Sequence, residues 1–229
     1  MGPSGSIGSG HVADEAQRKE ARRLLGLSSA AKKPQRQRLL LAAAIGAVFE
    51  RLPVVVGGAA EEHWLSEESR PTDLDLCPSP SRQDLRELAL LGFTREGRHW
   101  VHDEVVHGVE FPGSGEDIHR TIDVEVGGGK VRIIGLEDLY LDRLRQSTAS
   151  ETARFSQRLD SLIAISALWG SNLDRGYIDR QVEAITAIEP QVGRSMRMMQ
   201  RRVNREARHR LAEVRARELR AGRDDGRGR

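Results

Sequence analysis

Two carboxylates stand at a spacing that suits phosphate chemistry. Residues 73–76 read Asp-Leu-Asp-Leu, so a strand here would place Asp73 and Asp75 on one face and both leucines on the other. Two like charges this close repel each other unless a cation lies between them. Hard divalent ions such as Mg²⁺ bind carboxylate oxygens together with the phosphates of a substrate. The pair therefore predicts a magnesium site that acts on a phosphate-bearing molecule.

A short apolar run upstream supplies the second half of this pattern. Three valines at 54–56 are followed by Gly57 and Gly58, which is typical of a buried strand that turns sharply into a helix. Residues 59–65 suit the first turns of that helix, whose free backbone N–H groups and positive dipole end would face a bound phosphate. The sequence thus predicts a phosphate cradle at the two glycines, as part of the same site as the acidic strand.

The two motifs together resemble a known family signature. Gly57-Gly58, a helix-sized gap and residues 72–76 (Thr-Asp-Leu-Asp-Leu) look like the signature of the polymerase-beta-like nucleotidyltransferase superfamily. Within it, the pattern is similar to small bacterial members that include the abortive-infection toxins. The resemblance implies an α/β (α+β) fold with a mixed-sheet nucleotidyltransferase core, Mg²⁺ as cofactor, an NTP as substrate, and RNA or protein as candidate acceptors. In a toxin-type member, a cognate antitoxin would be a further partner.

The superfamily adds a third acid on a neighbouring strand, flanked by apolar residues. Glu110 stands between a valine and a phenylalanine, whereas Asp123 and Glu125 alternate with apolar residues. We favour Glu110, because its strand belongs to the pair that follows the helix after Asp75. Asp123 and Glu125 also fit the solvated face of a hairpin. The predicted catalytic and metal-binding residues are therefore Asp73, Asp75 and Glu110, with Asp123 as the alternative third acid.

The same resemblance implies nucleotide contacts. It assigns them to Gly57, Gly58 and Thr72 and points to the helix at residues 136–144, where the toxin-type group usually has a lysine. This chain offers Arg143, and an arginine neutralises phosphate but is never deprotonated for acid–base work. The role implied for Arg143 is therefore phosphate binding, although this helix fits a charged surface helix equally well.

Other classes of site have little support. His99 and His102 lie three residues apart, which on a strand places them on opposite faces. Without paired cysteines or a helical His-x-x-x-His, we do not expect a zinc site. Neither a nucleophile elbow nor a Gly-x-Gly-x-x-Gly dinucleotide fingerprint is present.

Composition limits the setting of the protein. A chain of 229 residues can bury one sizeable core and a helical extension. Cys77 is the only cysteine, which excludes an intramolecular disulfide and suits a reducing cytoplasm. The start of the chain lacks the features of a signal peptide, and no stretch has the length of a membrane span. We expect a soluble, cytoplasmic protein with no membrane partner.

The pattern of apolar residues predicts alternating helices and strands, then helices alone. Helices are expected at 11–27, 35–51, 59–65, 81–91, 135–146, 151–168, 175–188 and 191–221, and strands at 53–56, 73–76, 98–102, 105–111, 121–126 and 130–134. A linker is expected at 28–34, and Gly127 to Gly129 indicate a hairpin. The last helix has an arginine-rich face that is either solvated or follows an RNA backbone.

These elements predict three regions. Residues 1–35 form a disordered start and an N-terminal helix, 36–147 the nucleotidyltransferase-like domain, and 148–229 a helical C-terminal region. The predicted function is Mg²⁺-assisted transfer of a nucleotidyl group from an NTP to an acceptor hydroxyl. The alternative is a catalytically inactive nucleotide- or RNA-binding module on the same fold, since a fold does not fix a function.

Overall fold

The chain divides into two compact units. The computed structural model describes residues 12–65, 71–148 and 154–224. The first unit spans Met1–Gly135 and contains a seven-stranded sheet with helices α1 to α4, and the second spans Leu136–Arg229 and contains helices α5 to α8. The predicted α/β (α+β) class with a mixed sheet is confirmed. The expectations for residues 1–10 and for a helix start at Glu151 lie outside the described residues.

The sheet of the first unit places the acidic strand near its centre. Its strands run in the order β3-β4-β5-β2-β1-β7-β6. Two neighbouring pairs are parallel, β2 with β5 and β1 with β7, and the other pairs are antiparallel. The strand bounds are β1 Val54–Val56, β2 Asp73–Cys77, β3 Thr94–Glu96, β4 His99–His102, β5 Val105–Glu110, β6 Thr121–Val126 and β7 Gly129–Ile134.

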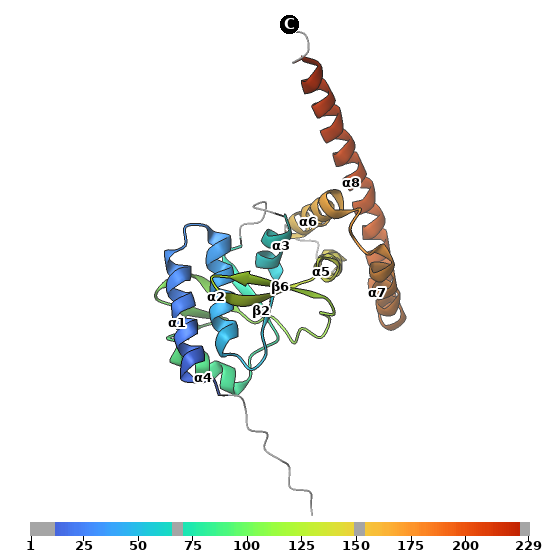
Figure 1. The fold of residues 1–229 in the computed structure, drawn as a ribbon. Coiled ribbons are helices and arrows are strands. Elements are labelled where there is room, and N and C mark those ends of the chain that lie inside the picture. Colours follow the sequence, from blue (N-terminus) through green and yellow to red (C-terminus); the bar gives the residue numbers. More distant parts are fainter. Residues whose placement is uncertain (1–11, 66–70, 149–153, 225–229) are drawn as a thin grey trace, which may run out of the picture. The chain divides into compact units, whose positions relative to one another are not determined.

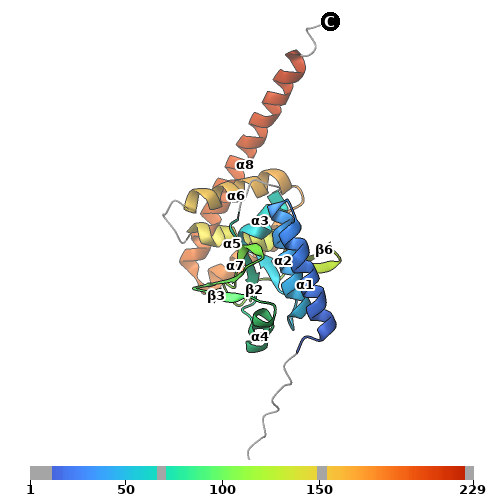
Figure 2. The ribbon, with the colours of Figure 1, turned by 90° about the vertical axis from the view of Figure 1, so that its left-hand side faces the viewer.

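Two helices cover one face of this sheet. The helices of the first unit are α1 Glu15–Ala30, α2 Pro34–Val48, α3 Gly57–Leu65 and α4 Arg82–Leu90. Figures 1 and 2 show α1 and α2 side by side across the sheet, and α2 contacts β7, β2 and β6. Leu74 and Leu76 of β2 are fully buried, as is most of the apolar surface of α2. The alternation in β2 therefore separates a leucine face from a carboxylate face, as the sequence indicated.

The linker between α1 and α2 is shorter than predicted. We expected it to begin at Ser28, but α1 continues to Ala30. The reason is that Ser28 is buried and its hydroxyl donates to the backbone oxygen of Gln37 at 2.8 Å. This contact satisfies the polar side chain inside the helix pair, so that serine does not end the helix here.

The glycine hairpin between β6 and β7 is confirmed. Gly127 and Gly128 both have positive φ angles, 59° and 85°, as a two-residue type I′ turn requires. All six pairs of the ladder from Thr121 with Ile134 to Val126 with Gly129 are in register.

The second unit is a group of four helices. They are α5 Leu136–Thr148, α6 Arg154–Trp169, α7 Arg175–Ile188 and α8 Pro190–Asp224. The predicted apolar stripe of the last helix is buried at Met196, Val203 and Ala207, whereas Leu211 and Val214 are exposed. None of the helices in the described part of the chain has both the length and the apolar character that a membrane crossing requires.

Candidate metal centre

Three carboxylates lie on one face of the central strands. In the parallel pair of β2 and β5, Asp75 lies level with Glu110, and Asp73 lies level with Gly108. Residues that are level in a parallel pair point to the same face, so Asp73, Asp75 and Glu110 share one face of the sheet. Gly108 has no side chain, and the side chain of His99 packs over it. The three acids that the sequence analysis favoured thus lie on one face of the sheet.

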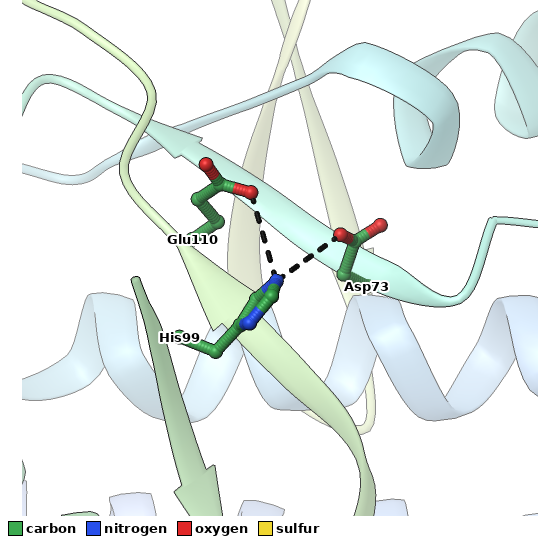
Figure 3. A group of neighbouring side chains, drawn as sticks. All are labelled: Asp73, His99 and Glu110. Atoms are coloured by element: carbon green, nitrogen blue, oxygen red, sulfur yellow. Dashed lines mark ion pairs between the residues drawn. The ribbon is translucent and has the colours of Figure 1, made fainter. Parts of the chain in front are cut away.

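A histidine completes this group. Figure 3 shows the imidazole of His99, from β4, pointing between the carboxylates of Asp73 and Glu110. Its Nε2 lies 3.6 Å from Oδ2 of Asp73 and 3.7 Å from Oε2 of Glu110. One ligand atom from each of the three residues lies within 4.8 Å of the others. The side chains are 29%, 18% and 34% exposed for Asp73, Glu110 and His99, so a solvent-borne cation can reach them.

The sequence analysis did not include His99 among the site residues and expected no zinc site. The β4–β5 ladder is irregular next to this residue. Trp100 pairs with Val109, but the pair nearer the turn is His102 with Val105, so the register shifts by two residues between them. The side chain of His99 packs over Gly108 in β5, with its Cβ 3.5 Å from the Cβ position of that glycine. The turn between the two strands could be read from the sequence, whereas the bulge could not.

Gly57 brings the start of α3 against Asp75. Gly57 has a φ angle of +61°, and Val56 before it pairs with Asp75. A Cβ atom on Gly57 would collide with Oδ2 of Asp75 and would lie 2.9 Å from its Cγ. A Cβ atom on Gly58 would lie 2.9 Å from Cβ of Pro71, which precedes the acidic strand. Both glycines are therefore needed for this close approach, which places the N-terminus of α3 beside the carboxylates.

A buried ion pair fixes the segment that leads into β2. Arg38 of α2 is 2% exposed and donates through Nε and Nη2 to Oε2 of Glu62, at 3.2 and 2.5 Å. Its Nη1 donates to the backbone oxygen of Pro71 at 2.9 Å. A single guanidinium thus joins α2 and α3 to the residues immediately before Asp73. Because buried charges persist only when they are paired, this contact sets the position of the acidic strand.

His107 supports the same segment from β5. Its Nδ1 faces the backbone oxygen of Thr72 at 3.3 Å, and its Nε2 faces Nη1 of Arg38 at 3.3 Å. Nε2 also faces the amide oxygen of Gln37 at 3.2 Å; a carbonyl oxygen only accepts, so Nδ1 carries a proton toward Thr72. Burial lowers the pKa of His107 below its ordinary value, and the charge of Arg38 lowers it further. His107 is therefore a structural histidine.

The alternative third acid lies far from this cluster. Asp123 is in β6, at the edge of the sheet, and β1 and β7 separate that strand from β2. Its carboxylate forms an ion pair with Arg132 at 2.8 Å and lies 3.7 Å from Lys130. The hydrogen bonds from Arg132 lower the pKa of Asp123. Glu125 is directly opposite Lys130 in the same hairpin.

The remaining predicted residues have different surroundings. Thr72 is exposed and directly precedes Asp73, so it is placed at the edge of the cluster. Arg143 belongs to α5 in the second unit, where it is 7% exposed. Its Nη1 contacts the carboxylate of Asp142 at 3.0 Å and the amide oxygen of Gln146 at 3.2 Å, both from its own helix.

The donor set fits a divalent cation. Asp73 and Glu110 offer carboxylate oxygens and His99 offers one imidazole nitrogen, whereas Asp75 shares the face but lies outside this group of three. Two ligand atoms bound to one ion at about 2.1 Å lie about 3.0 to 3.6 Å apart for angles between a right angle and a trigonal angle. The separations of 3.6 and 3.7 Å from Nε2 to the two carboxylates are close to the upper end of this range.

Comparison with known proteins adds one neighbour. No protein-family model matches the chain, and no curated protein matches it. Among solved structures, it is similar to the crystal structure of an antigenic nucleotidyltransferase-like protein from Paracoccidioides brasiliensis. The two chains are 12% identical, the match covers 78% of this chain and 93% of the other, and the TM-score is 0.44. A likeness of this size assigns neither a family nor an activity to the chain.

Proposed function

We propose that this protein is a metal-dependent nucleotidyltransferase, which moves a nucleotidyl group from an NTP to an acceptor hydroxyl. One observation supports this above all. The adjacent parallel strands β2 and β5 hold Asp73, Asp75 and Glu110 on one face, directly beside the glycine turn that opens α3. Carboxylates that hold a cation and a helix N-terminus that faces phosphate are the two parts that this chemistry needs.

The proposed reaction is a substitution at phosphorus. An oxygen of the acceptor hydroxyl forms a bond to the α-phosphorus of the NTP. The bond from that phosphorus to the oxygen that bridges to the β-phosphate breaks, and pyrophosphate leaves with the electron pair. The hydroxyl proton passes to a carboxylate of the site or to water. A divalent cation, when bound, neutralises the phosphates and the charge that develops on the leaving group.

The residues of the chain supply position. Asp73, Asp75 and Glu110 would hold the cation, and the first N–H groups of α3, which have no partner inside the helix, would face the phosphates. Gly57 and Gly58 keep this helix start close to the carboxylates because no side chain stands between them. Because positioning and charge neutralisation account for most of the rate in such reactions, small displacements of these groups would lower the rate strongly.

A transfer assay tests the proposal. The full chain is incubated with each α-³²P-labelled NTP, a divalent cation, total RNA and a protein extract, beside the variants Asp73→Asn and Asp123→Asn. We expect transfer by the native protein and by Asp123→Asn, which changes an acid at the far edge of the same sheet. Transfer by Asp73→Asn should fall at least about 100-fold. The labelled fraction names the acceptor class as RNA, protein or a small molecule.

Two outcomes would contradict the proposal. If Asp73→Asn transfers label at the native rate, the carboxylates do not act in the reaction. If NTP binds but no variant transfers label to any fraction, the chain is a nucleotide-binding module. Circular dichroism of each variant checks that the fold is retained.

A further inference from the structure

We infer that His99 is a ligand of the same cation and that it makes the site prefer a transition-metal ion such as Mn²⁺ to Mg²⁺. The inference rests on the proposed function for the role of the site, and it goes further by identifying a fourth metal-binding residue and the class of metal. It follows from the surroundings of the imidazole, the distances to the carboxylates and the chemistry of the donor atoms.

The surroundings of His99 differ from those of a structural histidine. His107 makes hydrogen bonds through both ring nitrogens, as does His102, whose Nε2 contacts the backbone oxygen of Leu91 at 3.1 Å and whose Nδ1 accepts from the N–H of Glu104 at 3.1 Å. In the described part of the chain, the ring of His99 has no hydrogen bond. Its Nε2 approaches two carboxylates at 3.6 and 3.7 Å, beyond the usual hydrogen-bond range of about 2.7 to 3.2 Å.

The distances suit a shared ion better than a direct contact. Nε2 of His99 is nearly equidistant from Oδ2 of Asp73 and Oε2 of Glu110. Metal–ligand bonds of about 2.1 Å and angles between a right angle and a trigonal angle give separations of about 3.0 to 3.6 Å between ligand atoms, close to the two distances here. The three side chains come from three adjacent strands, β2, β5 and β4, so the sheet itself fixes their spacing. An ion can therefore bind between them without a change in the backbone.

The type of donor atom decides which ion is preferred. Mg²⁺ binds oxygen ligands and keeps several waters. Mn²⁺ also suits carboxylates and water, but as a first-row transition ion it accepts an imidazole nitrogen more readily than Mg²⁺ does. A site made only of Asp73, Asp75 and Glu110 would favour Mg²⁺. Addition of His99 raises the affinity for a transition ion more than the affinity for Mg²⁺. The metal preference of this site is thus set by His99 and not by the carboxylates.

The neighbouring residue Arg98 provides a matched control. Its Nε lies 3.3 Å from Oε2 of Glu110, and its side chain is 65% exposed. Arg98 therefore contributes a positive charge beside the same carboxylate but cannot bind a metal ion. Arg98→Ala tests the effect of local charge alone, and His99→Ala tests the removal of a ligand.

The experiment measures binding of MnCl₂ and MgCl₂ to the full chain by calorimetry. The variants are His99→Ala, Arg98→Ala and Asp73→Asn, each checked for folding by circular dichroism. We expect the ratio of the Mg²⁺ to the Mn²⁺ dissociation constant to fall at least about tenfold in His99→Ala. In Arg98→Ala the ratio should be unchanged, because loss of a neighbouring positive charge strengthens binding of both ions alike. Asp73→Asn should weaken both ions.

Pulsed electron paramagnetic resonance of bound Mn²⁺ gives a direct readout. A directly bound imidazole nitrogen produces a ¹⁴N coupling, which we expect in the native protein and in Arg98→Ala but not in His99→Ala. Absence of that coupling in the native protein would overturn the inference. So would an unchanged binding ratio in His99→Ala, or tighter binding of both ions there, which would show that His99 competes with the cation for the carboxylates.

The two proposals can fail separately. If transfer requires Asp73 but the metal preference does not depend on His99, the nucleotidyltransferase stands and the ligand assignment falls. If the nitrogen coupling is present but no transfer occurs in any fraction, His99 is a metal ligand of a protein with another function.

Discussion

Replacement of Gly57 by alanine should displace Asp75 from the metal centre. Gly57 has a φ angle of +61°, and its Cβ position is 2.9 Å from Cγ and 3.1 Å from Cβ of Asp75. The backbone conformation alone costs an alanine about 1–2 kcal/mol. The collision with the carboxylate adds about 1–3 kcal/mol, typical of an overpacked site. We therefore expect Gly57→Ala to lower the free energy of unfolding by about 2–5 kcal/mol.

Gly97 separates the two parts of this cost. Its φ angle is +62°, nearly that of Gly57, but no atom lies within 4 Å of its Cβ position. Gly97→Ala should therefore show only the backbone cost of about 1–2 kcal/mol. The difference between the two variants is the free energy of the contact with Asp75. In an Asp75→Ala background the carboxylate is gone and only the 3.1 Å contact with Cβ remains, so Gly57→Ala should cost less than in the native protein and approach the cost of Gly97→Ala.

Urea unfolding followed by circular dichroism measures these free energies, with the slopes compared to exclude a change in the unfolded state. The same variants enter the transfer assay. A displacement of the Asp75 carboxylate by about 1 Å should lower the rate about 100-fold in Gly57→Ala, whereas Gly97→Ala should keep the native rate. If Gly57→Ala and Gly97→Ala have equal stability and equal activity, the glycine turn does not position Asp75 and the reasoning is refuted.

Two further predictions concern buried ion pairs of the first unit. Arg18 of α1 donates to both carboxylate oxygens of Glu87 in α4, at 2.9 and 3.0 Å, and these hydrogen bonds lower the pKa of Glu87. A lowered folded-state pKa gives stability that is present above the ordinary glutamate pKa of about 4.3 and is lost as the pH falls through the folded-state value. Glu87→Gln should therefore lower the free energy of unfolding by about 2 kcal/mol at pH 7 and make it less dependent on pH in the acid range. An unchanged pH dependence would argue against the ion pair. Arg38→Met should lower the free energy of unfolding by about 3–5 kcal/mol, because it leaves Glu62 charged and buried. The double variant with Glu62→Leu should recover part of this free energy in urea unfolding. No recovery would show that the contact of Arg38 with Pro71 matters more.

Much of the first unit could be predicted from local patterns. The alternation of acids and leucines in β2 fixed which side chains face the helices, since the side-chain period of a strand is two. Gly127 and Gly128 indicated a hairpin because that turn needs two positive φ angles. Glu110 could be favoured over Asp123 from the order of elements alone. In the structure β5 is the strand next to β2, whereas β6 is at the far edge, and the role of Glu110 stays a prediction.

Contacts between distant segments could not be predicted. Arg38 lies at the end of the polar first turn of α2, next to Arg36 and Gln37, and nothing near it in sequence indicates Glu62, which is 24 residues away. His99 lies beside the carboxylates on a strand whose ladder with β5 shifts register. A shift of register depends on how both strands pack on their neighbours, so periodicity within one strand cannot reveal it.

The charged groups on the two sides of β2 have different surroundings. On the helix side the guanidinium of Arg38 is buried and must be paired, and it pairs with Glu62 and with the backbone oxygen of Pro71. On the open side, Asp73, Asp75 and Glu110 repel one another, and partial exposure to water limits this cost. Positive groups at the rim reduce it further, namely Arg98 at 3.3 Å from Glu110 and the N-terminus of α3 beside Asp75. The paired contacts on the helix side therefore hold the three carboxylates close together in spite of their mutual repulsion, and a cation bound between them would relieve that repulsion.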